Sequence, residues 1–368
     1  MNFEFSDDQR MLRDHARRFL GEACSFHSLR TALNDPKQYD TKLWQQMVEQ
    51  GWMGVAISEA CGGMELGLLE LCVLSEELGR CVAAVPFFST VGLGAEILKQ
   101  CPAPANEDLL ARIVAGEAIV AVQLVTPGQA WSSDLTLENG RVTGTVPVLA
   151  YAAQADFAIL PATENTKNVL VLVDIHQPAV QRQSLVAMDH TVAHGELQLG
   201  GVACLTLCSG QEARSIMTKT VDQASILAAF EQVGAAEAAM EMARNYALER
   251  YTFGRPIGSY QAVKHKLADM AVKIELARSN AYYGAWALTA GSDDELAVAA
   301  AAAHLTASEA FEYCAEECLH LHGGIGYTWE ADCHFFYNRA RLLAVSLGNH
   351  SAWIDRLLAE KSLQALFA

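Results

Sequence analysis

Hydrophobic residues recur with a helical period through the first third of the chain and again through its last third. Ser6-Asp-Asp-Gln9 is a capping-box sequence, and the apolar positions that follow it fall at helical spacing. Further helices are predicted over residues 42–50, 66–82, 86–100 and 106–115, and later over 216–250, 260–290 and 295–321. The pattern therefore predicts two helical regions with a different segment between them.

In that middle segment the hydrophobic period changes to two, which is typical of β-strands. Ile119–Val125 reads as a strand, and Asn139-Gly140 is a hairpin signal between two alternating stretches. Further strands are expected over 156–160, 168–175, 180–185 and 194–199. We therefore expect a mainly α protein with three domains: N-terminal α-helical (1–117), middle antiparallel β (118–210) and C-terminal helical (211–368).

Charge and composition restrict the class of partner. The formal net charge is −17, with 51% hydrophobic and 19% charged residues, which argues against nucleic acid and anionic membrane partners. No signal peptide is visible at the N-terminus, and the longest apolar run, Leu296–Ala303, is too short to span a bilayer. We expect a cytoplasmic protein whose ten cysteines are reduced thiols.

Two cysteine spacings raise the question of a metal site. Cys204/Cys208 and Cys314/Cys318 are each four residues apart, and His320 and His322 follow the second pair. Structural zinc sites usually combine two tighter cysteine pairs, each on a turn, whereas small buried cysteines are common in helices. We therefore expect no metal.

The most unusual stretch runs from residue 249 to 270, between two long helical patterns. Gly254, Pro256 and Gly258 end one helix and open a turn before helical spacing resumes. An arginine beside an aromatic residue, as at Arg250 and Phe253, suits an anionic ligand with a flat ring system. The residues alone fit a plain helix–turn–helix corner with solvated charges equally well.

This stretch resembles the flavin-binding corner of the acyl-CoA dehydrogenase family. It reads Arg-x-x-Phe-Gly-x-x-Ile-x-x-x-Gln-Ala from Arg250, followed by Leu-Ala-Asp-Met, and residues 319–330 resemble the family's Gln-x-x-Gly-Gly-x-Gly segment. The order and spacing of the two motifs and the length of the chain are similar to the family's. The resemblance implies a β-barrel-like middle domain and a C-terminal four-helix bundle.

The resemblance also implies FAD as the cofactor and α,β-desaturation of an acyl-CoA thioester as the reaction. The residues that would contact FAD are Arg250, Thr252, Phe253, Ile257, Gln261, Val263, His320, Gly323 and Gly324. His320 stands where the family has glutamine, and the glycine pair can equally be a helix C-cap. In the family these contacts cross a subunit boundary, which implies at least a dimer, and electron-transfer flavoprotein is the expected electron acceptor.

The sequence departs from the family in the β domain. The family's Thr-Glu-Pro loop corresponds only loosely to residues 125–134, and its aromatic-Ile-Thr segment falls at Val148-Leu149-Ala150. An alanine side chain donates no hydrogen bond to a flavin, although a backbone N–H still could.

The catalytic base is also missing from both places where the family carries it. Ungapped threading puts Leu347 at one position, in Leu-Gly-Asn instead of Glu-Gly-Thr, and Ala224 at the other. Three polar residues lie nearby in sequence and are ordinarily solvated or capping groups: Asp222, Glu231 and His350. We therefore predict no catalytic residue in this chain.

Three hypotheses remain open. The chain is one subunit of a heteromeric acyl-CoA dehydrogenase whose partner supplies the base, as in family members that act on bulky substrates such as steroid side chains. Alternatively, it is a self-sufficient homo-oligomeric dehydrogenase with a displaced base, or a flavin-free scaffold subunit.

Overall fold

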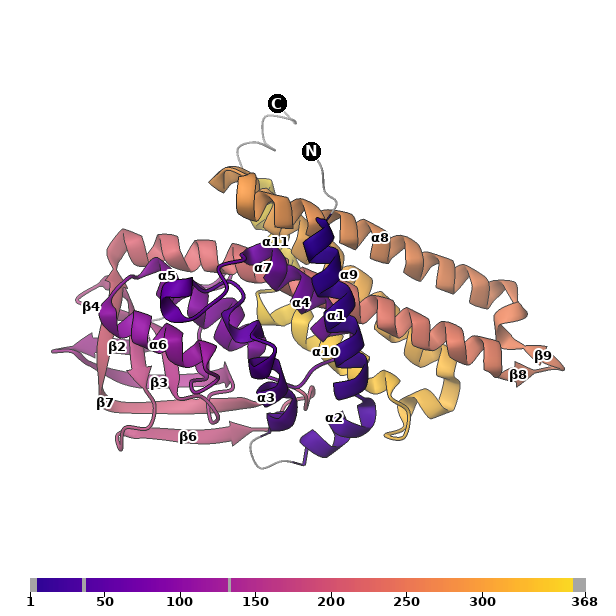
Figure 1. Ribbon diagram of the computed structural model, residues 1–368, viewed down its shortest axis with the longest axis horizontal. Helices are drawn as coiled ribbons and strands as arrows, with labels where there is room; N and C mark the ends of the chain where they lie inside the picture. Colours follow the sequence, from indigo (N-terminus) through magenta and orange to yellow (C-terminus); the bar gives the residue numbers. More distant parts are fainter. Residues whose placement is uncertain (1–4, 35–37, 132–133, 360–368) are drawn as a thin grey trace. The chain divides into compact units, whose positions relative to one another are not determined.

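The computed structural model describes residues 5–34, 38–131 and 134–359 (Figure 1). Contacts between residues divide the chain into two compact units. Unit 1 combines Met1–Ser28, Cys72–Ala83 and Ser225–Ala368, and unit 2 combines Leu29–Leu71 and Ala84–Ala224. Each unit thus joins segments that are distant in sequence. The three-domain division at residues 117 and 210 stays a prediction.

Unit 1 is helical. Its elements are α1 (Asp7–Ala23), the later part of α4 (Leu68–Arg80), most of α7 (Gly210–Glu249), α8 (Gln261–Ala290), α9 (Asp293–His322), α10 (Cys333–Ser346) and α11 (His350–Ala359). The predicted capping box at the start of α1 is confirmed, because Gln9 N–H donates to Ser6 Oγ (3.2 Å) and Ser6 N–H donates to Gln9 Oε1 (3.0 Å).

The long helices α8 and α9 lie side by side (Figure 1), and small residues allow them to do so. Ser292 caps α9 in a second capping box with Glu295. Along α9 the alanines at 299, 300, 303 and 307 are fully buried. Alanine has the highest helix propensity and adds little bulk, so this sequence suits a long helix packed inside a bundle.

Unit 2 joins short helices to a curved sheet. The helices include α3 (Thr41–Glu49), α5 (Glu96–Gln100) and α6 (Pro104–Val114). The predicted helix over 86–100 is a π-helix over Phe88–Ala95 that continues into α5. The short helix α2 (Phe26–Ala32), which begins in unit 1, was not predicted, because seven residues carry too little periodicity to be recognised.

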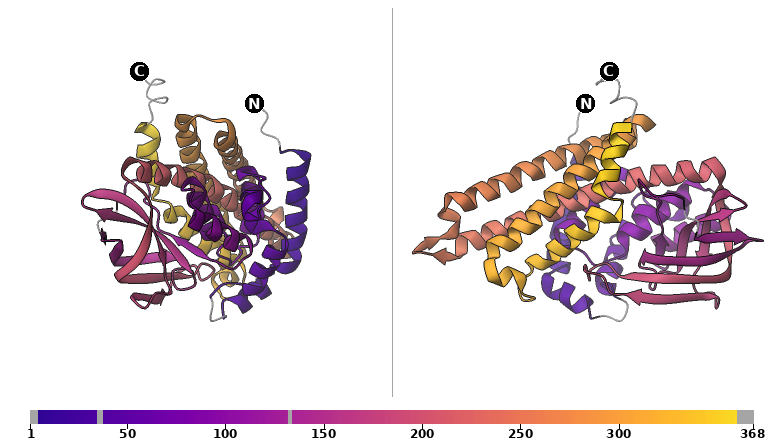
Figure 2. Two further views of the ribbon diagram at one scale, coloured as in Figure 1. Left: turned by 60° about the vertical axis from the view of Figure 1, so that its left-hand side comes forward. Right: turned by 180° about the vertical axis from the view of Figure 1, so that it is seen from behind.

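The seven strands of unit 2 form a barrel-like sheet (Figure 2). They are β1 (Val120–Val122), β2 (Leu135–Glu138), β3 (Arg141–Ala150), β4 (Phe157–Glu164), β5 (Lys167–Asp174), β6 (Val180–Leu185) and β7 (His194–Ser209). Their order is β1-β4-β2-β3-β7-β5, β6 pairs with β7, and β4 also pairs with β5, which closes the ring. The predicted fold class, mainly α with a middle β-barrel-like domain, is confirmed.

The prediction that this sheet is antiparallel needs one correction. β1 pairs with β4 in parallel, from Val120 opposite Phe157 to Val122 opposite Ile159, and β2 meets β4 in parallel at Thr136 and Thr163. Neither strand is joined to β4 by a tight turn, so no hairpin forces the antiparallel direction. The predicted hairpin is present between β2 and β3, where Asn139 (φ 50°) and Gly140 (φ 71°) both take the left-handed conformation of a type I′ turn.

Among the described residues, no helix combines the length and the hydrophobicity needed to cross a bilayer.

Candidate functional site

The predicted flavin-binding corner is a short hairpin at the end of α7. β8 (Tyr251–Thr252) pairs antiparallel with β9 (Arg255–Pro256), and Phe253 (φ 54°) and Gly254 (φ 80°) form the turn. Phe253 is 92% exposed. A large aromatic side chain that is both exposed and held at a positive φ costs stability, which is the pattern expected where the side chain contacts another molecule.

Arg250 lies at the base of this hairpin with its side chain exposed. Its backbone is held from both sides, because Arg250 N–H donates to Tyr246 O and Ile257 N–H donates to Arg250 O, each at 2.8 Å. Within the described part of the chain, the guanidinium of Arg250 makes no ion pair, whereas that of Arg255 stacks 3.9 Å from the Tyr260 ring. Arg250 is therefore the arginine of the corner that remains available to an anion.

The start of α8 adds a second feature that favours anions. Tyr260 occupies the N-cap position, but its side chain makes no capping hydrogen bond to the helix, and the exposed Gln261 begins the helix. The first amide groups of this 30-residue helix are thus not satisfied by a cap, and they carry the positive end of the helix dipole. Thr252 lies on this hairpin, Ile257 begins the short 3-10 turn that follows it, and Gln261 and Val263 lie on the first turn of α8.

The second predicted segment follows the end of α9. Gly323 (φ 64°) is the C-cap of α9, so the helix-cap interpretation of the glycine pair is correct. A Cβ at Gly324 would have no heavy atom within 4 Å, whereas one at Gly326 would lie 2.4 Å from Leu319 O. Gly326 is therefore required by packing and Gly324 is not, which leaves room for another molecule at Gly324.

One contact brings the two segments to the same end of unit 1. The rings of Tyr246 on α7 and His322 on α9 stack with centroids 4.2 Å apart, and Tyr246 OH donates to His322 O at 3.4 Å. Lys266 near the start of α8 also pairs with Glu317 near the end of α9 at 2.6 Å. His320, at the family's glutamine position, is exposed, and its ring lies 6.5 Å from that of Tyr327.

The cysteines considered as metal ligands lie in ordinary environments. Cys314 and Cys318 are fully buried on α9, and His322 Nδ1 donates to the carbonyl oxygen of Cys318 at 2.7 Å. Burial raises the pKa of Cys318, which keeps the sulfur protonated. No group of three or more His, Cys, Asp or Glu suited to a metal ion occurs among the residues that the structure describes.

The two positions at which sequence threading predicts the family's base are buried and apolar. Leu347, the C-cap of α10, is 2% exposed, and Ala224 on α7 is fully buried. Of the nearby polar residues, Glu231 is paired with Arg339 at 2.5 Å, Asp222 is buried, and His350 is exposed on the first turn of α11.

The segments of the β domain that depart from the family lie at the end of β3 and in the loop before β2. Val148 is exposed, Leu149 is buried, and Ala150 lies opposite His194 of β7. Ser132 and Ser133 of the loop over 125–134 lie outside the described residues.

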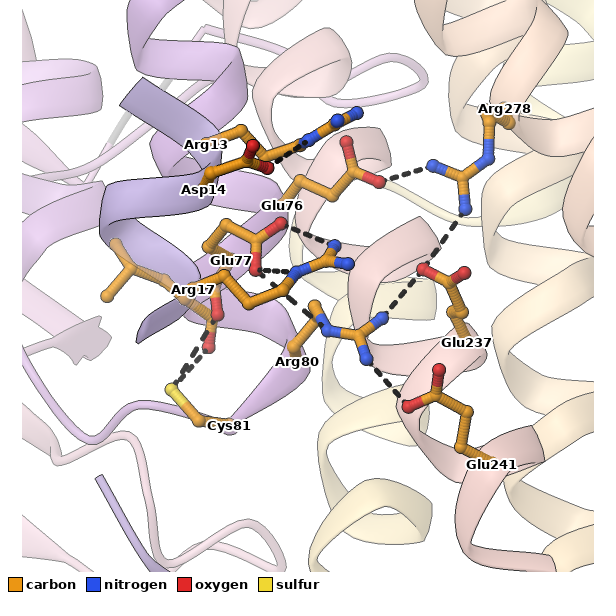
Figure 3. Close-up of polar contacts among 11 residues, drawn as sticks. Arg13, Asp14, Arg17, Glu76, Glu77, Arg80, Cys81, Glu237, Glu241 and Arg278 are labelled. Carbon is orange, nitrogen blue, oxygen red and sulfur yellow. Dashed lines mark hydrogen bonds and ion pairs between the residues drawn. The ribbon is translucent and has the colours of Figure 1, made fainter. Parts of the chain in front are cut away.

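Sequence reasoning missed a network of charges inside unit 1 (Figure 3). Arg17 of α1 contacts Glu77 of α4 through two hydrogen bonds, of 2.7 and 2.9 Å. Arg80 of α4 contacts Glu237 and Glu241 of α7, each at 2.6 Å. The network therefore ties α1, α4 and α7 together.

Glu76 and Arg278 extend the network to α8. Glu76 is 2% exposed and hydrogen bonds to Arg278, whose guanidinium also lies 3.2 Å from Glu237. Burial raises the pKa of Glu76, and the positive charge of Arg278 acts against that shift. The adjacent pair Glu76-Glu77 within an apolar stretch was the available sequence signal, because charges in such a stretch need partners.

Two glycines allow α4 and α7 to approach closely at this network. A Cβ at Gly79 would lie 2.0 Å from Glu231 O, and one at Gly234 would lie 1.9 Å from Glu76 O. Only glycine fits at such a crossing, because any side chain would force the two backbones apart.

Two regions of the chain match the domains of a known family. Residues 6–117 match the N-terminal domain of acyl-CoA dehydrogenases, and residues 214–359 match their C-terminal domain. Acyl-CoA dehydrogenase IpdE2 of Mycobacterium tuberculosis is 31% identical over 355 residues, which cover 96% of this chain and 97% of that protein. The chain belongs to the acyl-CoA dehydrogenase family. The family and the enzyme class predicted from the two motifs are confirmed.

Solved structures of acyl-CoA dehydrogenase complexes share the fold over nearly the whole chain. The Tcur3481-Tcur3483 steroid ACAD has a TM-score of 0.88 at 29% identity and covers 98% of this chain and 99% of its own. The ChsE4-ChsE5 complex from Mycobacterium tuberculosis has a TM-score of 0.89 at 25% identity, with the same coverage.

FAD is the cofactor of this acyl-CoA dehydrogenase family, as the sequence predicted. The residues present fit it: an arginine without an ion pair, an uncapped helix start and an open space at Gly324 are what a dinucleotide pyrophosphate requires. The individual FAD contacts stay predictions.

Proposed function

We propose that this chain is one subunit of a heteromeric acyl-CoA dehydrogenase and that a sister subunit supplies the catalytic base. The observation that carries the proposal is the pair of buried aliphatic residues, Leu347 and Ala224, at the two positions of the family's base. Neither side chain accepts a proton, and loss of general-base catalysis costs about 10²–10⁴-fold in rate. A chain of this kind contributes to desaturation only if another chain removes the proton.

A chain that lacks the catalytic base can still contribute to the enzyme through its predicted flavin-binding corner. FAD supplies the oxidant that accepts hydride from the β-carbon of the acyl group. Arg250 and the first turn of α8 would hold the pyrophosphate of FAD, and Gly323 and Gly324 would let the backbone approach it closely. These residues are kept while the base is absent, which is the pattern expected of a subunit that completes a shared site.

The alternatives to a partner's base are weak in this fold. Glu231 is held by Arg339 in an ion pair inside unit 1, so its carboxylate is already engaged by another side chain. His350 is exposed, and the usual role of an exposed polar group at a helix start is contact with water. Asp222 is buried on α7. This supports the heteromeric enzyme over a self-sufficient one with a displaced base.

The relatives support a proposal for the partners and the substrate. The two solved complexes named above each combine two different gene products, and one is described as a steroid ACAD. We infer a bulky, ring-bearing acyl-CoA as the substrate class, electron-transfer flavoprotein as the electron acceptor, and a cytoplasmic location.

Co-expression tests the proposal. The chain expressed alone should show little flavin absorbance and little dye-linked oxidation of a steroid-side-chain acyl-CoA, whereas co-expression with its sister subunit should restore both. Restoration of activity should fail when the catalytic glutamate of the sister is changed to glutamine. Asp222→Asn, Glu231→Gln and His350→Gln in this chain should leave the activity of the complex in place.

Robust oxidation by this chain alone, abolished by one of those three substitutions, would instead establish the self-sufficient enzyme. An active complex whose flavin content is changed by neither Arg250→Ala nor Gly324→Ala would instead support the scaffold role.

A further inference from the structure

His322, the last residue of α9, has its imidazole ring held in one orientation. The ring stacks on that of Tyr246, with centroids 4.2 Å apart and an angle of 25° between the ring planes. Its Nδ1 lies 2.7 Å from the carbonyl oxygen of Cys318, one helical turn earlier on α9. A Cβ at Gly326 would lie 3.0 Å from the Cβ of His322, so the chain after α9 also turns closely around this residue. Packing and hydrogen bonding of this kind fix a side chain in place.

The bond to Cys318 also fixes the tautomer of the His322 ring. A carbonyl oxygen can only accept a hydrogen bond, so Nδ1 of His322 carries the proton and donates it. In the neutral ring, Nε2 is then a hydrogen-bond acceptor. The chain provides Nε2 with no hydrogen-bond partner among the described residues, and His322 is only half-buried. Its free nitrogen is therefore an acceptor in a fixed position that is available to another molecule.

The position of His322 connects this acceptor to the predicted FAD site. Tyr246 makes the connection, because its ring stacks on His322 and its carbonyl oxygen accepts from Arg250 N–H at 2.8 Å. Gly323 and Gly324 follow His322 directly, and a Cβ at either position would have no heavy atom within 4 Å. His322 thus shares Tyr246 with the arginine proposed for the pyrophosphate and adjoins the open space at the glycine pair.

We propose that Nε2 of His322 accepts a hydrogen bond from a sugar hydroxyl group of FAD, next to the pyrophosphate. The inference rests on the proposed function, because it takes FAD to bind at this corner. A phosphate oxygen cannot bond to the neutral Nε2, since both are acceptors. The ribityl chain and the ribose of FAD flank the pyrophosphate, and both carry hydroxyl donors. Arg250 would hold the charged pyrophosphate, and His322 would position the sugar beside it.

Capping of α9 is the other role open to His322, because its Nδ1 satisfies the Cys318 carbonyl group near the end of the helix. The two roles use different nitrogen atoms, so substitution can separate them. Asparagine places its amide nitrogen near the position of Nδ1 and can keep the bond to Cys318, but it has no atom at the position of Nε2. Glutamine reaches the position of Nε2 and offers an acceptor oxygen there.

Fluorescence titration of FAD into the flavin-free assembled complex tests the assignment. His322→Asn should weaken FAD binding by about two- to tenfold, the effect of one neutral hydrogen bond, and should keep the melting midpoint of the flavin-free protein. His322→Gln should retain most of the affinity. Tyr246→Phe is the matched control, because it keeps the stacked ring and removes only the hydroxyl that bonds to His322 O, so it should bind FAD as the wild type does.

Two deoxygenated cofactors show which sugar supplies the donor. One is FAD without the ribityl hydroxyl groups, and the other is FAD without the ribose hydroxyl groups. One of the two should bind equally well to the wild type and to His322→Asn, because the hydroxyl that distinguishes these proteins is gone. A difference in affinity that persists with both analogues would overturn the proposed hydrogen bond.

The same titration distinguishes a failure of this inference from a failure of the proposed function. Wild-type FAD affinity in His322→Asn, together with weaker binding in Arg250→Ala, would overturn the role of His322 alone. Unchanged affinity in both variants would overturn the FAD site at this corner as well. FAD affinity does not depend on which subunit supplies the base, so neither result bears on the catalytic base of the sister subunit.

Discussion

Glu231 on α7 and Arg339 on α10 form a buried ion pair, with 2.5 Å between Glu231 Oε1 and Arg339 Nη1. The same guanidinium donates to the carbonyl oxygen of Ala83 at 3.4 Å. Since both side chains are buried, each charge depends on the other for stabilisation. A residue that sequence threading places near the family's base is therefore part of the internal framework of unit 1.

Arg339→Leu should consequently destabilise the protein. It leaves the Glu231 carboxylate buried without its partner, which costs roughly 3–5 kcal/mol in the free energy of unfolding. Lys273→Met is the matched control, because it breaks the exposed pair Lys273–Glu309 and should cost less than about 1 kcal/mol. Urea denaturation of both variants measures the difference, and equal midpoints would show that the buried pair contributes no more than a surface one.

Acid should weaken the contact between α9 and α11. His304 is 1% exposed, and its ring lies 4.8 Å from that of Trp353 on α11. Burial, followed by the nearby His350, lowers the pKa of His304 from 6.5 to about 4. As the pH falls below 6.5, the unfolded chain binds the proton first, so stability present at neutral pH is lost down to about pH 4.

The measurement is the free energy of unfolding of wild type and His304→Leu at two pH values. Between about pH 7.5 and 5, the wild type should lose about 2 kcal/mol more than the variant, because only the wild type carries this imidazole. Other groups titrate in both proteins and cancel in the comparison. Parallel pH profiles would mean that His304 is protonated as easily in the folded protein as in the unfolded chain.

Patterns with a local physical cause could be predicted from the sequence. The capping box of Ser6 and Gln9 and the Asn139-Gly140 turn each depend on a few neighbouring residues, and both are present. The closed order of the strands and the parallel pairing of β1 with β4 could not be predicted, because they depend on pairings between distant segments.

The features of the candidate site also divide into those with a local cause, which the sequence could predict, and those that depend on distant segments. The corner at Arg250 was recognisable because its residues are adjacent in sequence, whereas the ion pairs of Glu76 and Glu77 join residues more than fifty positions apart. No pattern in the sequence near Glu231 indicates that its ion-pair partner is Arg339. In the sequence alone, Gly79 and Gly234 look like ordinary helix glycines. The crossing of α4 and α7 shows why no larger residue fits at either position.

Arg250→Ala should reduce FAD retention by the assembled enzyme. The substitution removes one charge-assisted hydrogen bond and should weaken binding by roughly 1.5–3 kcal/mol, which is about ten- to a hundred-fold in affinity. Arg250→Lys should restore little, because an ammonium group cannot make the forked contact of a guanidinium.

Flavin absorbance per protein, measured after identical purification, checks this prediction. Arg244→Ala is the matched control, because Arg244 lies on the same helix and its guanidinium hydrogen bonds to the neighbouring Asn245. The assignment of Arg250 to the cofactor is wrong if both variants retain as much flavin as the wild type.

Two glycine-to-alanine substitutions separate a packing role from a cofactor role. Gly79→Ala places a Cβ 2.0 Å from the backbone oxygen of Glu231, so the two helices must separate, and overpacking of this kind costs roughly 1–3 kcal/mol. Its melting midpoint should fall with or without flavin. Gly324→Ala meets no atom of the chain within 4 Å and should change the stability of the flavin-free protein by less than about 0.5 kcal/mol.

Gly324→Ala should nevertheless lower the flavin content of the co-expressed complex, because the added methyl group occupies space that the cofactor needs. The informative result is therefore a variant with the melting midpoint of the wild-type apoprotein and a lower flavin absorbance. Full flavin occupancy in Gly324→Ala would show that the open space at this glycine is not used by FAD. A lowered midpoint in the flavin-free protein would show that Gly324 serves packing, as Gly79 and Gly326 do.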